Sequence, residues 1–161
     1  MQTYIFPPGS NGQTVAVTHR YLDNGNFNVF AAWHDQHGGG NSATLPVMVL
    51  NIAPTLTNLH AETHGHRLTL TGEILDPGRD GFTLVVHWGD GHKDTYSFTP
   101  GTTRFEVHHR YGDPGRYKIQ LSLTDDDGGE DQESLIVDVD SRGLRHDPWR
   151  IWLSELLGRD D

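Results

Sequence analysis

The residues with the clearest potential for chemistry are acidic side chains crowded into one short segment. Asp125, Asp126 and Asp127 are consecutive, and Glu130 follows after two glycines. Calcium takes about six to eight oxygen ligands, and carboxylates on one turn can supply several of them. The spacing is not that of an EF-hand loop, and the related segment at 35–41 keeps only one acid. We therefore expect either a calcium site at these residues or a solvated acidic turn, with calcium as the one candidate cofactor.

Histidine is abundant, with 11 residues in the chain, and raises the question of zinc. His64-Gly65-His66, His34 with His37, and His108-His109 are the closest groups. None of them has the His-Glu-x-x-His spacing of a metalloprotease. Neighbouring residues of a strand point to opposite faces, so His108 and His109 are poorly placed to share a metal. Three convergent ligands with an open position are not evident, and we do not expect catalytic zinc.

Nucleophilic catalysis has no support either. The chain has no cysteine, which excludes a thiol enzyme. Serine, histidine and aspartate are plentiful, but no Gly-x-Ser-x-Gly elbow is present. We expect no catalytic residue and predict that the chain is not an enzyme.

One aromatic side chain is a candidate for ligand binding. Phe30 has the opposite parity to Phe27 and Val29 in an alternating run, so it is expected on the outer face of a strand. A flat ring on a sheet face can stack on a sugar, which makes polysaccharide a candidate ligand.

The elements that position these residues are predicted to be β-strands. Apolar and polar residues alternate in the segments 67–70, 82–88, 105–107, 117–124 and 135–139. Strict alternation indicates that one face of a strand is buried and the other is exposed to water. Turn signals such as Asp76-Pro77-Gly78 and Asp113-Pro114-Gly115 separate these segments. Many short strands at regular spacing predict an all-β sandwich.

The chain also repeats itself, and the first copy lacks its front half. The segment beginning at His19-Arg20-Tyr21 recurs 90 positions later at His109-Arg110-Tyr111, with 11 identities over the 31 positions 19–49 and 109–139. Val15 and Val17 match Phe105 and Val107 in the same way. A period of this size is one small domain. We predict a C-terminal half domain at 1–51, a complete domain at 52–140 and a tail at 141–161 that forms a short amphipathic helix.

The motifs of the complete copy resemble those of the polycystic kidney disease (PKD) domain. They are Trp88-Gly89-Asp90-Gly91, then His109-Arg110-Tyr111 with Pro114-Gly115 and Tyr117, then Thr124-Asp125 with Gly128-Gly129. The resemblance covers 53–140 fully and 3–51 as a half. It implies an immunoglobulin-like β-sandwich whose motif residues are structural: Trp88, Gly89, Asp90, Gly91, Tyr111, Gly115 and Tyr117. The indole of Trp88 is expected to fill the centre of the space between the sheets, and the tyrosine hydroxyl is expected to bond nearby backbone.

Charge and hydropathy restrict the partners. The formal net charge is −10, which argues against duplex nucleic acid and against an anionic membrane surface. No segment approaches the ~20 apolar residues of a membrane span. The first residues show no signal peptide, so any export signal is expected outside this fragment.

A half domain alone leaves about ten apolar side chains uncovered, at roughly 1.5–3 kcal/mol of forgone burial each. We expect cover from a second chain, giving a homodimer through the half domain, or from the tail helix through Trp149, Trp152 and Leu156, or else partial disorder of the half domain. The resemblance implies a non-catalytic extracellular or cell-surface module that acts as a spacer, adhesion or protein-interaction unit beside neighbouring domains of the same parent protein. The alternatives are a polysaccharide-binding accessory domain of a secreted hydrolase and a calcium-stiffened adhesin segment.

Overall fold

The computed structural model describes residues 3–7, 12 and 14–140, and every regular element in these residues is a β-strand. No helix in this part of the chain is long and apolar enough to cross a membrane. The predicted tail helix, with Trp149, Trp152 and Leu156, lies outside the described residues. The strands are β1 (Gly25–His34), β2 (Gly40–Val49), β3 (Thr55–His64), β4 (Arg67–Leu75), β5 (Phe82–His87), β6 (Lys93–Phe98), β7 (Arg104–Arg110), β8 (Gly115–Asp125) and β9 (Glu130–Val139).

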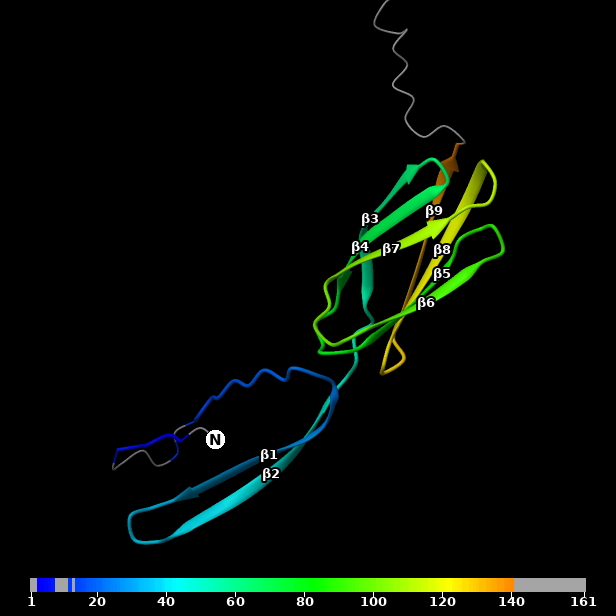
Figure 1. The fold of residues 1–161 in the computed structure, drawn as a ribbon. Helices are drawn as coiled ribbons and strands as arrows, with labels where there is room; N and C mark the ends of the chain where they lie inside the picture. The colour runs from blue at the N-terminus through cyan, green and yellow to red at the C-terminus, as the bar shows by residue number, and fades with distance from the viewer. Residues whose placement is uncertain (1–2, 8–11, 13, 141–161) are drawn as a thin grey trace, which may run out of the picture.

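The complete copy is a sandwich of two antiparallel sheets, as predicted. One sheet has the strand order β3-β4-β7 and the other has the order β6-β5-β8-β9. The sheets lie face to face, and β3 also runs beside β9 (Figure 1). This arrangement is immunoglobulin-like and confirms the predicted fold class.

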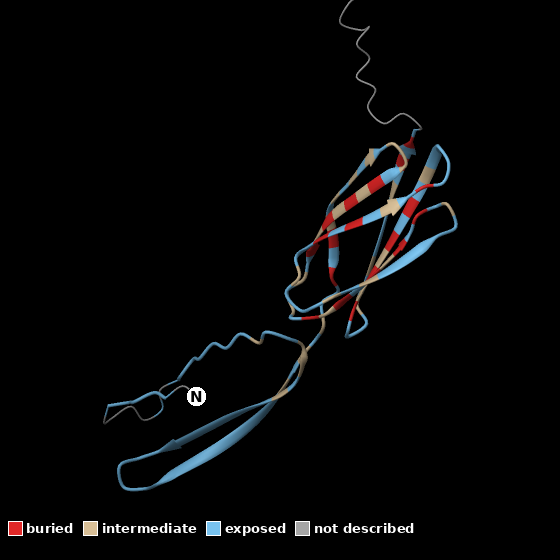
Figure 2. Cartoon of the chain, in the orientation of Figure 1, coloured by how far each residue is buried: buried red, intermediate tan, exposed pale blue. Residues whose placement is uncertain are grey.

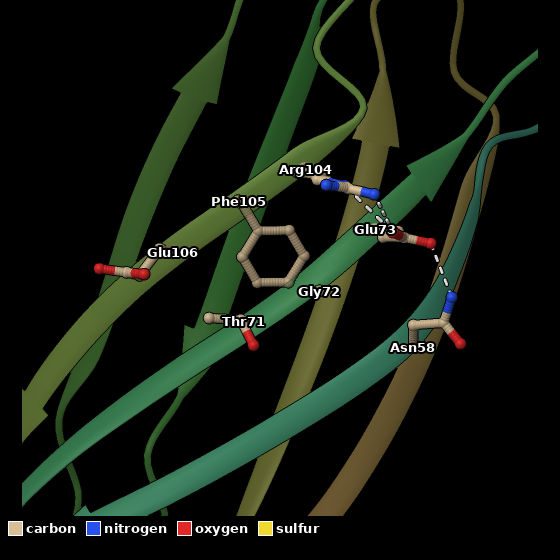
Figure 3. Close-up of a pocket in the computed structure, with 7 residues that line it drawn as sticks. All are labelled: Asn58, Thr71, Gly72, Glu73, Arg104, Phe105 and Glu106. Carbon is tan, nitrogen blue, oxygen red and sulfur yellow. Dashed lines mark hydrogen bonds and ion pairs between the residues drawn. The ribbon is translucent and has the colours of Figure 1, made fainter.

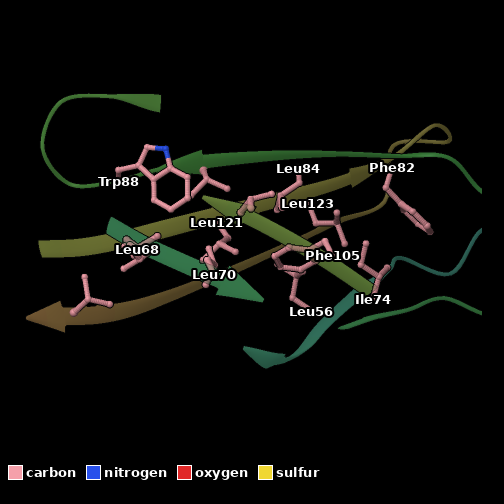
Figure 4. Close-up of a cluster of buried hydrophobic side chains, with 14 of the residues drawn as sticks. Leu56, Leu68, Leu70, Ile74, Phe82, Leu84, Trp88, Phe105, Leu121 and Leu123 are labelled. Atoms are coloured by element: carbon pink, nitrogen blue, oxygen red, sulfur yellow. The ribbon is translucent and has the colours of Figure 1, made fainter. Parts of the chain in front are cut away.

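The core lies between the two sheets and is built from alternate residues of each strand. Leu70, Leu84, Val86, Ile119 and Leu123 are completely buried, and the residues between them are partly or fully exposed (Figure 2). Trp88 is completely buried, as expected, but its indole closes one end of the apolar layer instead of filling its centre (Figure 4). Each fully buried aliphatic or aromatic side chain contributes about 1.5–3 kcal/mol, so this layer is the main source of stability.

Strand β3 contains an irregularity that its sequence pattern conceals. Its pairing with β4 shifts between Thr57 and His60, and Asn58 adopts a φ of 51°. The extra residue moves the inward face from Leu56 to Leu59 and Ala61. A β-bulge of this kind breaks the alternation that would otherwise identify the strand.

The N-terminal copy reproduces the last hairpin of the complete copy. Gly25 pairs with Val49 in β1–β2, and Gly115 pairs with Val139 in β8–β9, so the register is the same at the 90-residue offset. The rings of His19 and Tyr21 contact edge to face with centroids 4.7 Å apart, and the equivalent rings of His109 and Tyr111 do the same at 4.7 Å.

The apolar face of this hairpin is open to solvent in the described residues. Val29, Trp33 and Leu45 are 40%, 57% and 62% exposed, and Figure 2 shows the hairpin almost wholly in the exposed colour. The alignment of Val15 and Val17 with Phe105 and Val107 predicts a strand equivalent to β7. Residues 14–24 contain no strand, so this prediction is wrong. In the complete copy β7 pairs with β4, and among residues 3–7, 12 and 14–51 the only strands are β1 and β2, which pair with each other.

Candidate functional site

The predicted calcium ligand Asp125 has one oxygen that already holds the β8–β9 turn together. Its Oδ1 accepts hydrogen bonds from the backbone N–H groups of Asp127 and Gly129, at 3.0 and 2.6 Å. Asp35 does the same in the N-terminal copy, accepting from His37 and Gly39 at 2.8 Å each. This repeated role is turn stabilisation. Only Oδ2 of Asp125 differs, because it accepts a hydrogen bond from Asn51 Nδ2 at 2.8 Å.

The other three predicted ligands do not converge with Asp125. Asp126 is exposed, and its Oδ1 accepts a hydrogen bond from Gly81 N at 2.9 Å. Glu130 is exposed and lies in none of the close groups of acidic and histidine side chains among the described residues. Asp127 is exposed and turns toward different partners.

Those partners form what we call the acidic joint: Asp23, Asp76, Asp80, Asp125 and Asp127. Two groups of three carboxylates share Asp80, one with Asp23 and Asp127 and the other with Asp76 and Asp125. Within each group the oxygens lie within 4.8 Å of one another. Asp23 precedes β1, Asp76 and Asp80 lie between β4 and β5, Asp125 is the last residue of β8, and Asp127 lies on the β8–β9 turn. That turn is at the end of the sandwich nearest the β1–β2 hairpin, so the two copies meet here (Figure 1).

The centre of the acidic joint is buried without compensating charge. Asp80 is 1% exposed and Asp125 is 5% exposed. Oδ2 of Asp80 and Oδ2 of Asp76 are buried with no hydrogen-bond partner. None of these carboxylates forms an ion pair with a lysine or arginine of the described residues. Burial and the neighbouring carboxylates of Asp23, Asp76 and Asp125 raise the pKa of Asp80 to about 7.

The donor set of the acidic joint consists of oxygen atoms, which suits a hard divalent cation such as calcium. Asp23, Asp76 and Asp80 were not predicted as ligands. Asp76 and Asp80 belong to a segment that reads as a turn, and Asp23 belongs to the repeated motif. Nothing in the sequence alone indicates that these three loops meet.

A second group, Asp90 with His92 and His109, has the composition of a metal site, but the Asp90 carboxylate is already hydrogen-bonded by the two histidines. His109 Nε2 lies 2.8 Å from Asp90 Oδ2, and Asp90 Oδ1 accepts from His92 N at 3.0 Å. The His109 ring stacks on the indole of Trp88, with centroids 4.7 Å apart and planes 5° apart. Burial alone would raise the pKa of Asp90, but the hydrogen bonds and charge of these histidines outweigh it and lower the pKa.

The other histidines of the described residues lie in no close group of three with acidic side chains or with one another. His108 and His109 point to opposite faces of β7, with side chains 64% and 10% exposed, as their adjacent positions predict. His64 lies near Glu62, and His66 Nδ1 lies 3.1 Å from the Tyr111 carbonyl oxygen.

The family motif residues form one hydrogen-bonded unit around Trp88. The Tyr111 hydroxyl donates to the Trp88 carbonyl oxygen at 3.0 Å, and the indole Nε1 donates to Asp94 Oδ2 at 2.8 Å. Gly89 and Gly91 have φ angles of 86° and 92°, which glycine adopts without strain. These contacts join the β5–β6 turn to the connection between β7 and β8.

The outer face of the β3-β4-β7 sheet carries a shallow depression of about 430 Å³, lined in part by Gly72 and Phe105 (Figure 3). Glu73 is held there between Arg104 Nε at 3.1 Å and Asn58 Nδ2 at 2.6 Å. An exposed pair of this kind is worth about 0–1 kcal/mol. The lining offers no nucleophile and base in contact, so the depression has no evident catalytic chemistry.

The aromatic candidate Phe30 lies on the β1–β2 hairpin, both faces of which are open to solvent in the described residues. Phe30 is on β1 and is 61% exposed. Its neighbours on the same face of the hairpin, such as Thr44 and Met48, are also exposed.

Comparison with known proteins places residues 51–139 within the profile of the PKD domain. Among solved structures, the PKD1 domain of Vibrio anguillarum Epp is 19% identical, covers 58% of this chain and all of that one (100%), and has a TM-score of 0.49. The PKD1 domain of the Vibrio cholerae metalloprotease PrtV is 21% identical, with coverage of 55% and 99% and a TM-score of 0.46. The PKD domain of an M14-like peptidase from a Thermoplasmatales archaeon has 21% identity, 56% and 99% coverage and a TM-score of 0.46. No curated protein sequence matches the chain.

Proposed function

Because the chain belongs to the PKD domain family, we propose that it is a non-catalytic module of a larger extracellular or cell-surface protein. Its role in that protein is to space and join neighbouring domains, or to bind another protein. The family membership supports this role, since the motif residues serve the scaffold and leave no assembled catalytic centre in the described residues.

The observation that carries the proposal is the end-to-end placement of the two copies. The β1–β2 hairpin lies beyond one end of the sandwich, and β9 ends at the opposite end (Figure 1). A chain that enters at one end of a stiff sandwich and leaves at the other holds its neighbours apart by the length of the domain. Antiparallel strands of about ten residues span roughly 30 Å, which sets the scale of that separation.

The location is tested by antibody labelling of intact cells that express the parent protein. We expect an antibody against the chain to label unpermeabilised cells or the culture medium. Labelling that appears only after permeabilisation would contradict the extracellular assignment. The spacer role is tested by small-angle scattering of the 161-residue chain, which should show an elongated particle; a spherical particle would contradict it.

A polysaccharide-binding accessory role is a second candidate, favoured by the exposed ring of Phe30. Phe30→Ala should abolish pull-down on insoluble glycans if the ring stacks on sugar. Met48→Ala is the matched control, because Met48 is 69% exposed on the same face of the hairpin and is not aromatic. Equal retention of wild type and both variants would remove this candidate.

A calcium-stiffened segment is the third candidate. The observation that favours it is the buried Asp80 carboxylate, which has an unpartnered oxygen among other carboxylates. The predicted ligands Asp125 and Asp127 belong to this acidic joint, whereas Asp126 and Glu130 are no longer preferred.

A further inference from the structure

We propose that a group of basic side chains on the outer face of the β3-β4-β7 sheet binds the acid group of a sugar, either a carboxylate or a sulfate ester. We call this group the arginine patch, and its members are His64, Arg67, His108 and Arg110. The proposal depends neither on the spacer role nor on the ring of Phe30, because the patch lies on the sandwich and acts through charge.

The register of the sheet brings the arginine patch together. Arg67 of β4 lies directly opposite Arg110 of β7, and His64 of β3 lies directly opposite Arg67. His108 precedes Arg110 by two positions, so both are on the same face of β7. The four side chains are exposed and line a depression of about 700 Å³, which the buried Leu68 also lines. The patch is at the end of the sandwich opposite the β1–β2 hairpin (Figure 1).

The two arginines of the patch face each other without an acidic partner. Among the residues that the structure describes, the only ion pair of an arginine joins Arg104 to Glu73. Like charges directly opposite each other on neighbouring strands destabilise a sheet. An oxyanion bound between Arg67 and Arg110 removes this repulsion and supplies the acceptor that their N–H groups lack.

The nearest carboxylates contact the histidines of the patch and leave the arginines free. Glu62 Oε2 lies 3.9 Å from His64 Nε2. Glu106 Oε1 lies 3.4 Å from His108 Nε2. Both glutamates are more than half exposed, at 60% and 62% of their side chains. They therefore flank the patch without neutralising its centre.

The chemistry of the arginine patch suits one oxyanion with hydroxyl groups beside it. The Cβ atoms of directly opposite residues are about 4.5–5.5 Å apart, so two guanidinium groups can reach the same ligand. The planar guanidinium fork matches a carboxylate or a sulfate by paired N–H donors. Thr69 Oγ1, 3.2 Å from His108 Nδ1, and the histidine rings can hydrogen-bond sugar hydroxyls.

The charge of the whole chain selects a ligand with an isolated acid group. The formal net charge is −10, which repels nucleic acid and other densely charged polymers at long range. A single acid group on an otherwise neutral sugar chain is repelled far less. The arginine patch can therefore capture a glycan that carries occasional acidic sugars.

The position of the patch favours a sugar over an acidic peptide. An extended peptide gains affinity by pairing its main chain with the free edge of a sheet. Arg67 lies on β4, and both edges of β4 are already paired, with β3 and with β7. A peptide lying across the patch would contact side chains alone. The acid and hydroxyl groups of a sugar need only such side-chain partners.

The test is a nuclear magnetic resonance titration of the 161-residue chain. The probes are glucuronic acid, glucose 6-sulfate, neutral glucose and a blocked peptide of four aspartates, all at constant ionic strength. We expect the two acidic sugars to shift the amide signals of Arg67 and Arg110 in a saturable way. Neutral glucose should leave these signals unchanged, and the peptide should bind more weakly than either acidic sugar.

Arg67→Gln and Arg110→Gln are the decisive variants, and Arg104→Gln is their matched control. Arg104 is exposed on the same face of β7 as Arg110 but is paired with Glu73. Each decisive variant should weaken binding of the acidic sugars by roughly tenfold or more, because it removes a charged hydrogen-bond donor. Arg104→Gln should bind as wild type does.

Thermal unfolding without ligand separates a lost binding site from a damaged fold. Arg67→Gln should melt at the same temperature as wild type or higher, because it removes one of two facing positive charges. The proposal is overturned if neither acidic sugar gives saturable shifts, or if both decisive variants bind them as wild type does. Tighter binding of the aspartate peptide than of the acidic sugars would also overturn it and would assign the patch to a protein partner.

Discussion

The hydroxyl of Tyr111 offers a sharp test of how the family motif stabilises the sandwich. Tyr111 is 1% exposed, and its hydroxyl donates to the Trp88 carbonyl oxygen at 3.0 Å. Burial is also the main reason that the pKa of Tyr111 is raised, so the hydroxyl remains a donor throughout the accessible pH range. Tyr111→Phe removes only this oxygen and leaves the buried carbonyl of Trp88 without its donor.

The expected loss is about 1–3 kcal/mol in the free energy of unfolding, the usual cost of an unsatisfied buried polar group. For a domain of this size each kcal/mol lowers the melting temperature by about 4–8 °C. Urea unfolding followed by far-ultraviolet circular dichroism measures the change, and the slope with denaturant should stay constant.

Tyr21→Phe is the matched control. Tyr21 occupies the equivalent motif position, and its ring contacts Phe27 with centroids 4.4 Å apart, as Tyr111 contacts Tyr117 at 4.1 Å. No described residue accepts a hydrogen bond from its hydroxyl, since the N-terminal copy has no counterpart of Trp88. We expect a change below about 0.5 kcal/mol. Equal losses for the two variants, or a negligible loss for Tyr111→Phe, would refute this account of the motif.

Further outcomes follow from the same geometry. The pKa of Asp90 is lower in the folded protein than in the unfolded chain, where it is about 3.9. Its carboxylate therefore stabilises the fold above that pH, and this stabilisation is lost as the pH falls through the folded value. In urea unfolding measured from about pH 6 to pH 2, Asp90→Asn should reduce the fall in the free energy of unfolding at acid pH. Gly91→Ala should lower the free energy of unfolding by roughly 1–3 kcal/mol through backbone strain alone, because a Cβ there would meet open space. Gly89→Ala should lower it further, because its Cβ would lie 2.6 Å from the Lys118 carbonyl oxygen. Equal melting temperatures for the two variants would contradict this. The exposed face of β1–β2 should drive reversible dimerisation, and sedimentation that shows only monomer from micromolar to millimolar concentration would exclude it.

Much of the fold could be predicted because its signals are local. Period-two alternation predicted the strands that contain Leu70, Leu84 and Leu121, and each of these side chains is buried. The 90-residue repeat predicted a hairpin equivalent to β8–β9, and β1–β2 has the same register. Alternation is visible in sequence whenever one face of a strand meets a core and the other meets water.

Two strands were not predicted, for different physical reasons. In β3 the bulge at Thr57–His60 reverses the inward parity, so no single alternating pattern runs through the strand. Strand β6 lies at the edge of its sheet, and four of its six residues are exposed. An edge strand with little buried surface has little hydrophobic pattern to reveal it.

The sequence by itself determined the sandwich, its repeat and the family, because turn residues and alternating side chains act over a few neighbouring positions. It also singled out consecutive acids on one turn, of which Asp125 and Asp127 lie in the acidic joint and Asp126 and Glu130 do not. Only the tertiary structure brought Asp23, Asp76 and Asp80 to that turn. These residues lie on loops that are far apart along the chain, and such loops come together only once the sheets have stacked and the N-terminal copy has docked at the end of the sandwich.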